Sequence, residues 1–177
     1  MRTNNNRVTE DIPSVMTGFW NEARLSELDF DEIEEIRAGT TCLMDYLHGI
    51  CTIFALALHD LYGYPVYCLA DPYEVEEYGN PALAEDYFPI IHDFCMIGDP
   101  FEEGTVYLDC RGAVNHLQLF LEEFRDFFDS FQLLPYSDEN LDTVRDRYWK
   151  EIGTAVADAH YNNARGYILA HEDQFKL

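Results

Sequence analysis

A chain of 177 residues, 47% of them hydrophobic and 15% aromatic, is long enough for one domain with a packed core, and this composition argues against a disordered chain. Eleven basic residues stand against 34 acidic ones, so the formal net charge is −23. Such a charge argues against nucleic acid and membranes as partners and favours basic ones. We expect most carboxylates to form a solvated surface; a basic protein partner or mimicry of DNA would account for the same charge.

The N-terminal residues carry no signal for export or for membrane insertion. Residues 1–13 are polar and rich in asparagine, which predicts a flexible arm. No apolar run is long enough to cross a bilayer. The five cysteines follow no disulfide framework and no metal-ligand spacing, so we expect reduced thiols in a cytoplasmic protein.

Residues 14–177 are predicted to form a single domain, with a core at about 40–114 and a helical C-terminal extension at about 115–173. One or two short helices are expected over residues 14–37. A longer helix is expected over 51–62, because its apolar residues recur at i, i+3, i+4 and i+7. Gly63 would end this helix, and the sequence YPVYCLA (64–70) is typical of a strand.

The segment over residues 71–88 contains two prolines, a glycine and many carboxylates, which predicts a long loop. Such a loop is a lid, a binding loop that selects a basic peptide or an amine, or a solvated insertion. After it, two apolar runs, IIHDFCMIG (90–98) and TVYLDCRG (105–112), predict an antiparallel hairpin.

Helices are predicted beyond Ala113. An apolar stripe is expected on the first, and a second should open at Ser137 or Asp138 and be followed by helical structure to about Ala170. The stripe consists of Leu117, Phe120, Leu121, Phe124, Phe127, Phe128 and Phe131. We interpret it as core rather than as a ligand site.

Cys51 stands at the start of the predicted 51–62 helix, where unpaired N–H groups and the helix dipole lower the pKa of a thiol. A hairpin loop at 99–102 would set His92 opposite Asp109, with Cβ atoms about 4.5–5.5 Å apart. A loop one residue different would turn the two side chains to opposite faces. The three residues together predict a nucleophile, its base and the group that orients the base. The alternatives are a buried structural thiol, a core histidine and an aspartate that caps the turn before Gly112.

The other cysteines, at 42, 68, 95 and 110, are expected to be inert packing residues. A zinc site made of His92, Cys95 and Cys110 is disfavoured, because neighbouring strand residues point to opposite faces. The sequence contains no GxSxG, HExxH, GxxxxGK or GxGxxG motif. We therefore expect no metal and no cofactor.

The sequence around Cys51 resembles the transglutaminase-like family. Residues 49–55, GICTIFA, match the pattern G-x-C-x-x-F-A, and LYGYP (61–65) matches the L-x-G-x-P that leads into the first strand. His92 and Asp109 stand where the family has its histidine and aspartate. The resemblance covers about residues 47–112. Thr52 stands where the animal enzymes often have tryptophan, and Cys110-Arg111 where proline and threonine are common.

The resemblance implies a papain-like α+β fold, in which a helix bearing the nucleophile packs on a small antiparallel sheet, and a Cys51–His92–Asp109 triad. The expected function is that of a protease, deamidase or transglutaminase-like acyltransferase acting on a protein or peptide, basic ones among them. The backbone N–H of Cys51 would bind the oxyanion, with Tyr46 or His48 as candidates for the second donor. The alternative is a catalytically inactive acidic interaction module or inhibitor, of phage or plasmid type, that binds a basic partner.

Overall fold

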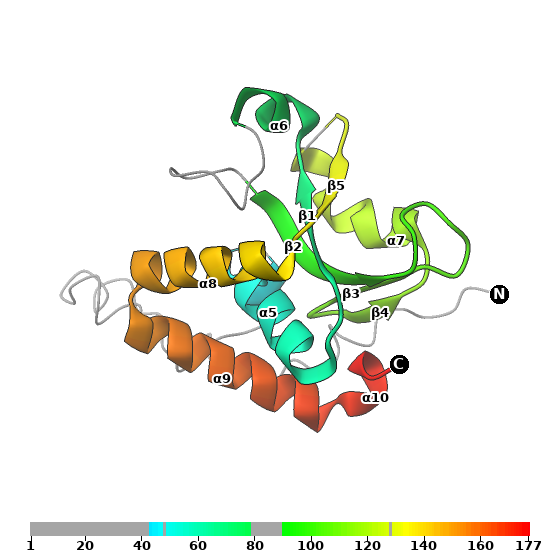
Figure 1. Ribbon diagram of the computed structural model, residues 1–177. Coiled ribbons are helices and arrows are strands. Elements are labelled where there is room, and N and C mark those ends of the chain that lie inside the picture. Colours follow the sequence, from blue (N-terminus) through cyan, green and yellow to red (C-terminus); the bar gives the residue numbers. More distant parts are fainter. Residues whose placement is uncertain (1–42, 48, 79–89, 128) are drawn as a thin grey trace, which may run out of the picture.

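The computed structural model describes residues 43–47, 49–78, 90–127 and 129–177 (Figure 1). In these residues seven α-helices and one 3-10 helix pack on a single antiparallel sheet with the strand order β4-β3-β2-β1-β5. This arrangement confirms the α+β class. The arm predicted at 1–13 and the helices predicted at 14–37 lie outside the described residues.

The strands are β1 (Val66–Ala70), β2 (Ile90–Ile97), β3 (Val106–Asp109), β4 (Gly112–Val114) and β5 (Gln132–Pro135). The helices are α4 (Leu43–Leu47), α5 (Cys51–Tyr62), α6 (Pro72–Tyr78), α7 (Leu117–Leu121), the 3-10 helix η2 (Glu122–Phe127), α8 (Asp138–Ile152), α9 (Thr154–Ala170) and α10 (Glu172–Phe175). None of these helices is long and apolar enough to span a membrane.

Helix α5 is the central helix of the fold and has the predicted bounds. It lies between the sheet and the pair α8 and α9 (Figure 1), so its first eight residues, Cys51–Leu58, are all buried. The helix ends at Gly63, whose φ of 72° is the left-handed conformation that glycine adopts at low cost. This packing fixes the start of α5, and with it Cys51, against β2.

Helix α6 occupies part of the segment predicted to be a loop, so that prediction is wrong for residues 72–78. Pro72 takes the first helical position, where its missing N–H costs nothing. Asp71 Oδ1 accepts a hydrogen bond of 2.8 Å from the backbone N–H of Tyr73. The proline therefore starts a helix here, and residues 79–89 lie outside the described residues.

Strands β2 and β3 form the predicted hairpin, but the loop is longer than expected. The strands end at Ile97 and begin at Val106, so the connection covers residues 98–105 instead of 99–102. Thr105 closes it with a hydrogen bond of 2.6 Å from Oγ1 to the carbonyl oxygen of Asp99. Cys95 pairs with Leu108, and this register puts Phe94, not His92, opposite Asp109.

The register error spans two residues, so it does not change the face on which the side chains lie. Asp93 and Cys95 point toward α5, where Cys95 Sγ donates to the carbonyl oxygen of Ala55. His92 and Phe94 lie on the opposite face, against Phe120 and other aromatic residues of α7 and η2. The two faces of β2 therefore meet different helices.

The segment after Ala113 departs from the prediction at its end. Phe120 and Phe124 are buried as expected, but Phe127 is 60% exposed. The chain then forms β5, an unpredicted edge strand that pairs with β1 and lies outside the core bounds of about 40–114. The α8 prediction is confirmed, since Ser137 Oγ accepts from the backbone N–H of Asn140, and helical structure does continue to Ala170.

Candidate functional site

Cys51 occupies the first position of α5. The residue before it, Ile50, has no polar side chain, so no side chain caps the free N–H groups of the first turn. The Cys51 side chain is buried, and its Sγ accepts a hydrogen bond of 3.4 Å from the backbone N–H of Asp93. The sulfur therefore lies between a helix start and the middle strand of the sheet.

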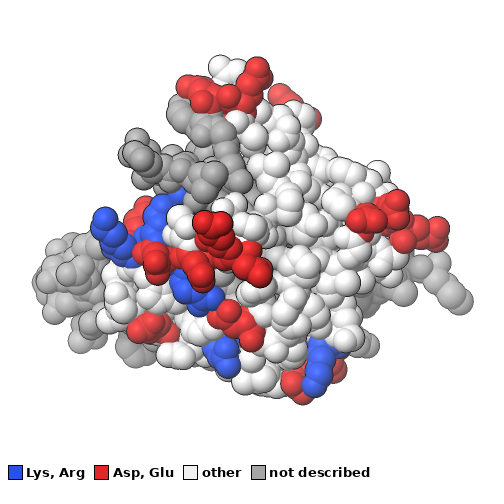
Figure 2. Space-filling model, in the orientation of Figure 1, with Lys and Arg blue, Asp and Glu red and all other residues white. Residues whose placement is uncertain are grey.

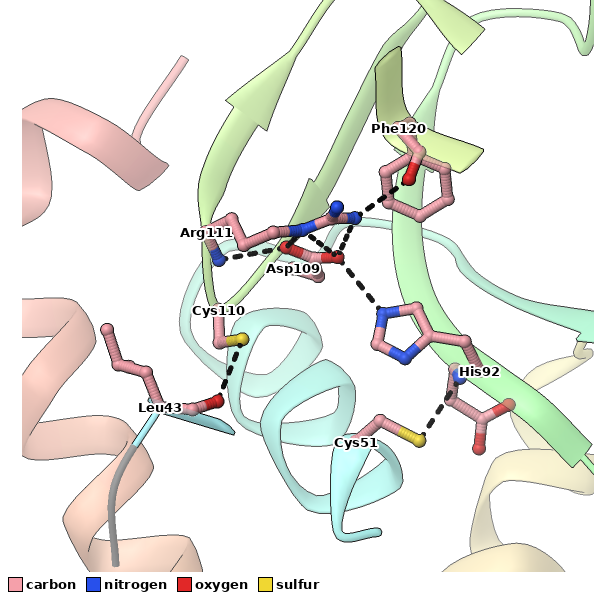
Figure 3. Close-up of polar contacts among 8 residues, drawn as sticks. Leu43, Cys51, His92, Asp109, Cys110, Arg111 and Phe120 are labelled. Atoms are coloured by element: carbon pink, nitrogen blue, oxygen red, sulfur yellow. Dashed lines mark hydrogen bonds and ion pairs between the residues drawn. The ribbon is translucent and has the colours of Figure 1, made fainter. Parts of the chain in front are cut away.

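His92 and Asp109 are hydrogen-bonded, as the sequence predicted. His92 Nε2 lies 3.1 Å from Asp109 Oδ2, and both side chains are buried (Figure 3). The contact forms diagonally across β2 and β3 instead of between directly opposed residues, because the register is shifted by two.

Arg111 holds the carboxylate of Asp109 from its other side. Its Nη2 donates to Oδ2 at 2.6 Å, its Nε lies 3.1 Å from both oxygens, and its backbone N–H donates to Oδ1 at 2.8 Å. Burial by itself would raise the pKa of Asp109, but the hydrogen bond from His92 and the charge and hydrogen bonds of Arg111 outweigh it and hold the pKa well below its ordinary value. Asp109 is thus ionised.

The ionised carboxylate determines which nitrogen of His92 carries the hydrogen. An ionised carboxylate can only accept, so Nε2 must be the donor and Nδ1 of the neutral ring carries the lone pair. Nδ1 is buried and has no hydrogen-bond partner among the described residues. Figure 3 shows the edge of the ring with Nδ1 on the side where the Cys51 sulfur lies. Among the described residues no hydrogen bond joins His92 to Cys51, and the imidazole lies on the face of β2 away from α5, which bears Cys51.

Aromatic rings enclose the imidazole. The ring of Phe124 stacks on His92 at a centroid distance of 4.4 Å, and Phe94 and Phe120 lie at 6.3 and 6.1 Å. The Arg111 guanidinium lies 5.1 and 5.2 Å from the ring centres of Phe120 and Phe124 and donates to the carbonyl oxygen of Phe120. This enclosure keeps water from the His92–Asp109 pair and fixes the orientation of the ring.

The thiol of Cys51 does not have the lowered pKa that its position at the helix start predicted. Burial and the negative charge of Asp93 raise the pKa to about 12, against the smaller lowering effects of hydrogen bonds from the Asp93 N–H and from Thr52. The effect of burial on the pKa of Cys51 is thus larger than the effect of the helix start. The resting sulfur is therefore a neutral thiol, which needs a base before it can attack.

Asp93 is the residue of the site that sequence reasoning missed. Only 1% of it is exposed, and its carboxylate accepts hydrogen bonds from Thr52 Oγ1 at 2.8 Å and from the Tyr136 hydroxyl at 3.1 Å. Burial raises its pKa, and the donors oppose that rise. The signal was visible, since Asp93 is the only carboxylate in the apolar run IIHDFCMI.

Tyr46 and three of the other cysteines have structural roles. The Tyr46 hydroxyl donates to the carbonyl oxygen of His160 at 2.7 Å, so its hydrogen is not available at Cys51, while His48 lies outside the described residues. Cys68, Cys95 and Cys110 donate to backbone carbonyl oxygens within the core. Among the described residues no group of three possible ligands could hold a metal ion, and Cys42 lies outside them.

The surface carries its acidic residues in separate groups. Figure 2 shows them around α6, at the loop after β2 and over α8, where lysine and arginine lie among them. The first two groups are Glu74, Glu76 and Glu77, and Asp99, Glu102 and Glu103. On this face the negative charge is spread over several places, which does not select one basic ligand.

Comparison of the chain with protein-family models, with curated proteins and with solved structures finds no match. The candidate site therefore rests on the contacts among the described residues alone.

Proposed function

We propose that this protein is a cysteine-dependent enzyme that transfers or hydrolyses an acyl or amide group through Cys51, His92 and Asp109. One observation carries the proposal: a buried imidazole is bonded through Nε2 to an ionised carboxylate, its Nδ1 has no partner among the described residues, and the next residue of the same strand contacts the Cys51 thiol at the start of α5. A buried nitrogen without a hydrogen bond lowers the stability of the fold, and a role in proton transfer would explain why it is kept.

The reaction begins when Nδ1 of His92 takes the proton of the Cys51 thiol while Sγ attacks the carbonyl carbon of the substrate. The uncapped N–H groups at the start of α5 are donors for the oxyanion that forms. The imidazolium then protonates the leaving nitrogen, and the bond to that nitrogen breaks to leave a thioester. Asp109 holds the ring and stabilises its positive charge in both steps. Water or an amine, deprotonated by His92, then attacks the thioester; the C–S bond breaks to release the acyl product, and the imidazolium returns the proton to Cys51 Sγ.

We propose a papain-like core of the transglutaminase-like type for this chemistry and a protein or peptide as substrate, basic peptides among them. The helix that bears Cys51 packs on an antiparallel sheet whose neighbouring strands carry His92 and Asp109, which is the arrangement this proposal needs. We place the enzyme in the cytoplasm, where reducing conditions keep Cys51 as a thiol.

Selective alkylation of Cys51 tests the proposal. The full chain is treated with sub-stoichiometric iodoacetamide near neutral pH, and each cysteine peptide is quantified by mass spectrometry. We expect Cys51 to react well before the other four cysteines, and we expect His92→Gln to abolish this preference because the thiol then has no base. His116→Gln, a change at an exposed histidine outside the site, should leave it intact. Uniform slow labelling, or equal labelling in His92→Gln, would contradict the proposal.

A second candidate function is that of an acidic interaction module or inhibitor without catalysis. The burial of Cys51, the raised pKa of its thiol and the net charge of −23 support it. The partner would be a basic protein. The same alkylation experiment separates the two candidates, since a binding module needs no reactive cysteine.

A further inference from the structure

Asp93 joins three parts of the fold at the nucleophile. Its backbone N–H donates to Cys51 Sγ, and its carboxylate accepts from Thr52, the next residue of α5, and from Tyr136, which follows β5. The carboxylate lies on the α5 face of β2, and in the strand pairing Asp93 stands directly opposite Cys68 of β1. No arginine or lysine is bonded to it among the described residues, although Arg147 acts on it through its charge.

Asp93 on β2 and Thr52 on α5 act directly on the Cys51 thiol, and Cys51 in turn acts on Cys68 of β1 and on Cys110, which follows β3. Asp93 itself is acted on by Thr52, His92, Tyr136 and Arg147. Asp109 is neutralised by Arg111 at 2.6 Å, whereas Asp93 has only hydroxyl donors. The Asp93 carboxylate is therefore the charged group that acts on the Cys51 thiol.

We propose that Asp93 is a positioning residue of the proposed catalytic site: it ties the start of α5 to the sheet and keeps the resting nucleophile in its neutral thiol form. A carboxylate in this place opposes a second negative charge on the neighbouring sulfur. The inference rests on the proposed function only for its catalytic meaning, because the effect on the thiol is independent of any substrate.

In the proposed reaction, loss of the thiol proton and attack on the carbonyl carbon occur together. The Cys51 sulfur is a neutral thiol at rest, because burial and Asp93 raise its pKa. The S–H bond breaks toward His92 Nδ1 as the S–C bond forms, and the π electron pair of the carbonyl moves to its oxygen. The proton on Nδ1 then leaves with the amine as the C–N bond breaks. Negative charge thus passes from sulfur to the carbonyl oxygen without a free thiolate beside Asp93.

The test removes the carboxylate charge and measures how readily the thiol ionises. Full-length His92→Gln, with and without Asp93→Asn, is alkylated with iodoacetamide over a range of pH, and labelling of Cys51 is followed by mass spectrometry. Without the imidazole the rate follows the thiolate fraction. We expect Asp93→Asn to lower the pH midpoint by at least about one unit, or about tenfold in labelling below both midpoints. Asp173→Asn, an equal charge change on an exposed residue of α10, should leave the midpoint in place.

Tyr136→Phe provides a second variant in case Asp93→Asn does not fold. It removes one donor from the carboxylate, which makes the ionised form of Asp93 less favourable, so the midpoint should fall in the same direction by a smaller amount. A purely structural role would change the urea midpoint and leave the pH midpoint unchanged, and that result overturns the inference. The proposed function fails by a different result, namely labelling that His92→Gln does not slow in the otherwise native chain.

Discussion

The two faces of β2 hold two buried carboxyl groups whose pKa values are shifted in opposite directions. Asp109 binds His92 on one face, and Asp93 lies on the face toward α5. Asp109 is 3% exposed and Asp93 is 1% exposed. The pKa of Asp109 is held below its ordinary value, whereas burial raises the pKa of Asp93. The two differ in their partners: a guanidinium and an imidazole on one side, two hydroxyl groups on the other.

This difference shows that burial alone does not determine the charge of a group. Both carboxylates lose solvation, but only Asp109 gains a full positive charge at hydrogen-bonding distance. The two carboxyl groups therefore differ in what they contact: Asp109 binds the imidazole of His92, whereas Asp93 lies beside the Cys51 thiol.

The largest expected effect comes from breaking the Asp109–Arg111 pair. Asp109→Asn leaves a largely buried guanidinium without its counter-ion, so the free energy of unfolding should fall by about 3–5 kcal/mol in urea titrations. Asp109→Asn combined with Arg111→Met should recover part of this loss. An unchanged urea midpoint in Asp109→Asn would mean that the ion pair does not hold this face.

Removal of the aromatic cover should have the next largest effect. Phe124→Leu loses the ring stacked on His92 and part of the apolar contact, so we expect about 2 kcal/mol lower stability and slower labelling of Cys51. Arg125→Ala is the matched control, because Arg125 lies in the same 3-10 helix but its side chain is 73% exposed. Its ion pair with Glu122 is long, at 3.9 Å, and lies in solvent. It should change neither the urea midpoint nor the labelling.

The contributions of the two carboxyl groups to the free energy of unfolding should change with pH in opposite directions. The stability that Asp109 contributes is present above its unfolded pKa of 3.8 and is lost as the pH falls through its lower folded value. For Asp93 the folded pKa is raised, so its contribution is present below 3.8 and is lost as the pH rises through the folded value.

The stability of Asp93→Asn relative to the native chain should therefore increase as the pH rises from acid to neutral. Urea titrations at several pH values measure this difference between the variant and the native chain. A relative stability that falls over this pH range would show that the carboxylate is held favourably in its ionised form.

The sequence predicted the elements whose signals are local. Helix α5 has a clear apolar period and a glycine at its end, and α8 has Ser137 as its N-cap, so their starts were predictable. The 98–105 loop was not predictable in length, yet the error in register was an even number and left His92 and Asp109 on one face.

The missed features depend on contacts distant in sequence. Strand β5 has four residues and forms only because the edge of β1 is available to it, and α6 was hidden because Pro72 was taken as a loop residue when it begins a helix. The pKa of Cys51 could not follow from its place at a helix start, because Asp93 and the surrounding core decide it. Local patterns thus predicted the His92–Asp109 contact, and tertiary packing determined the pKa of Cys51.

The central claim is that Cys51 is a nucleophile served by His92, and acylation by an activated ester tests it most directly. The full chain is mixed with p-nitrophenyl acetate, the release of nitrophenolate is followed in time, and the intact mass is measured. We predict a burst of one equivalent per chain, an acetyl group on Cys51 that hydroxylamine removes, and the loss of both signals in Cys51→Ser and in His92→Gln. The absence of a burst from the folded native chain, or acetylation unchanged in His92→Gln, would contradict this account.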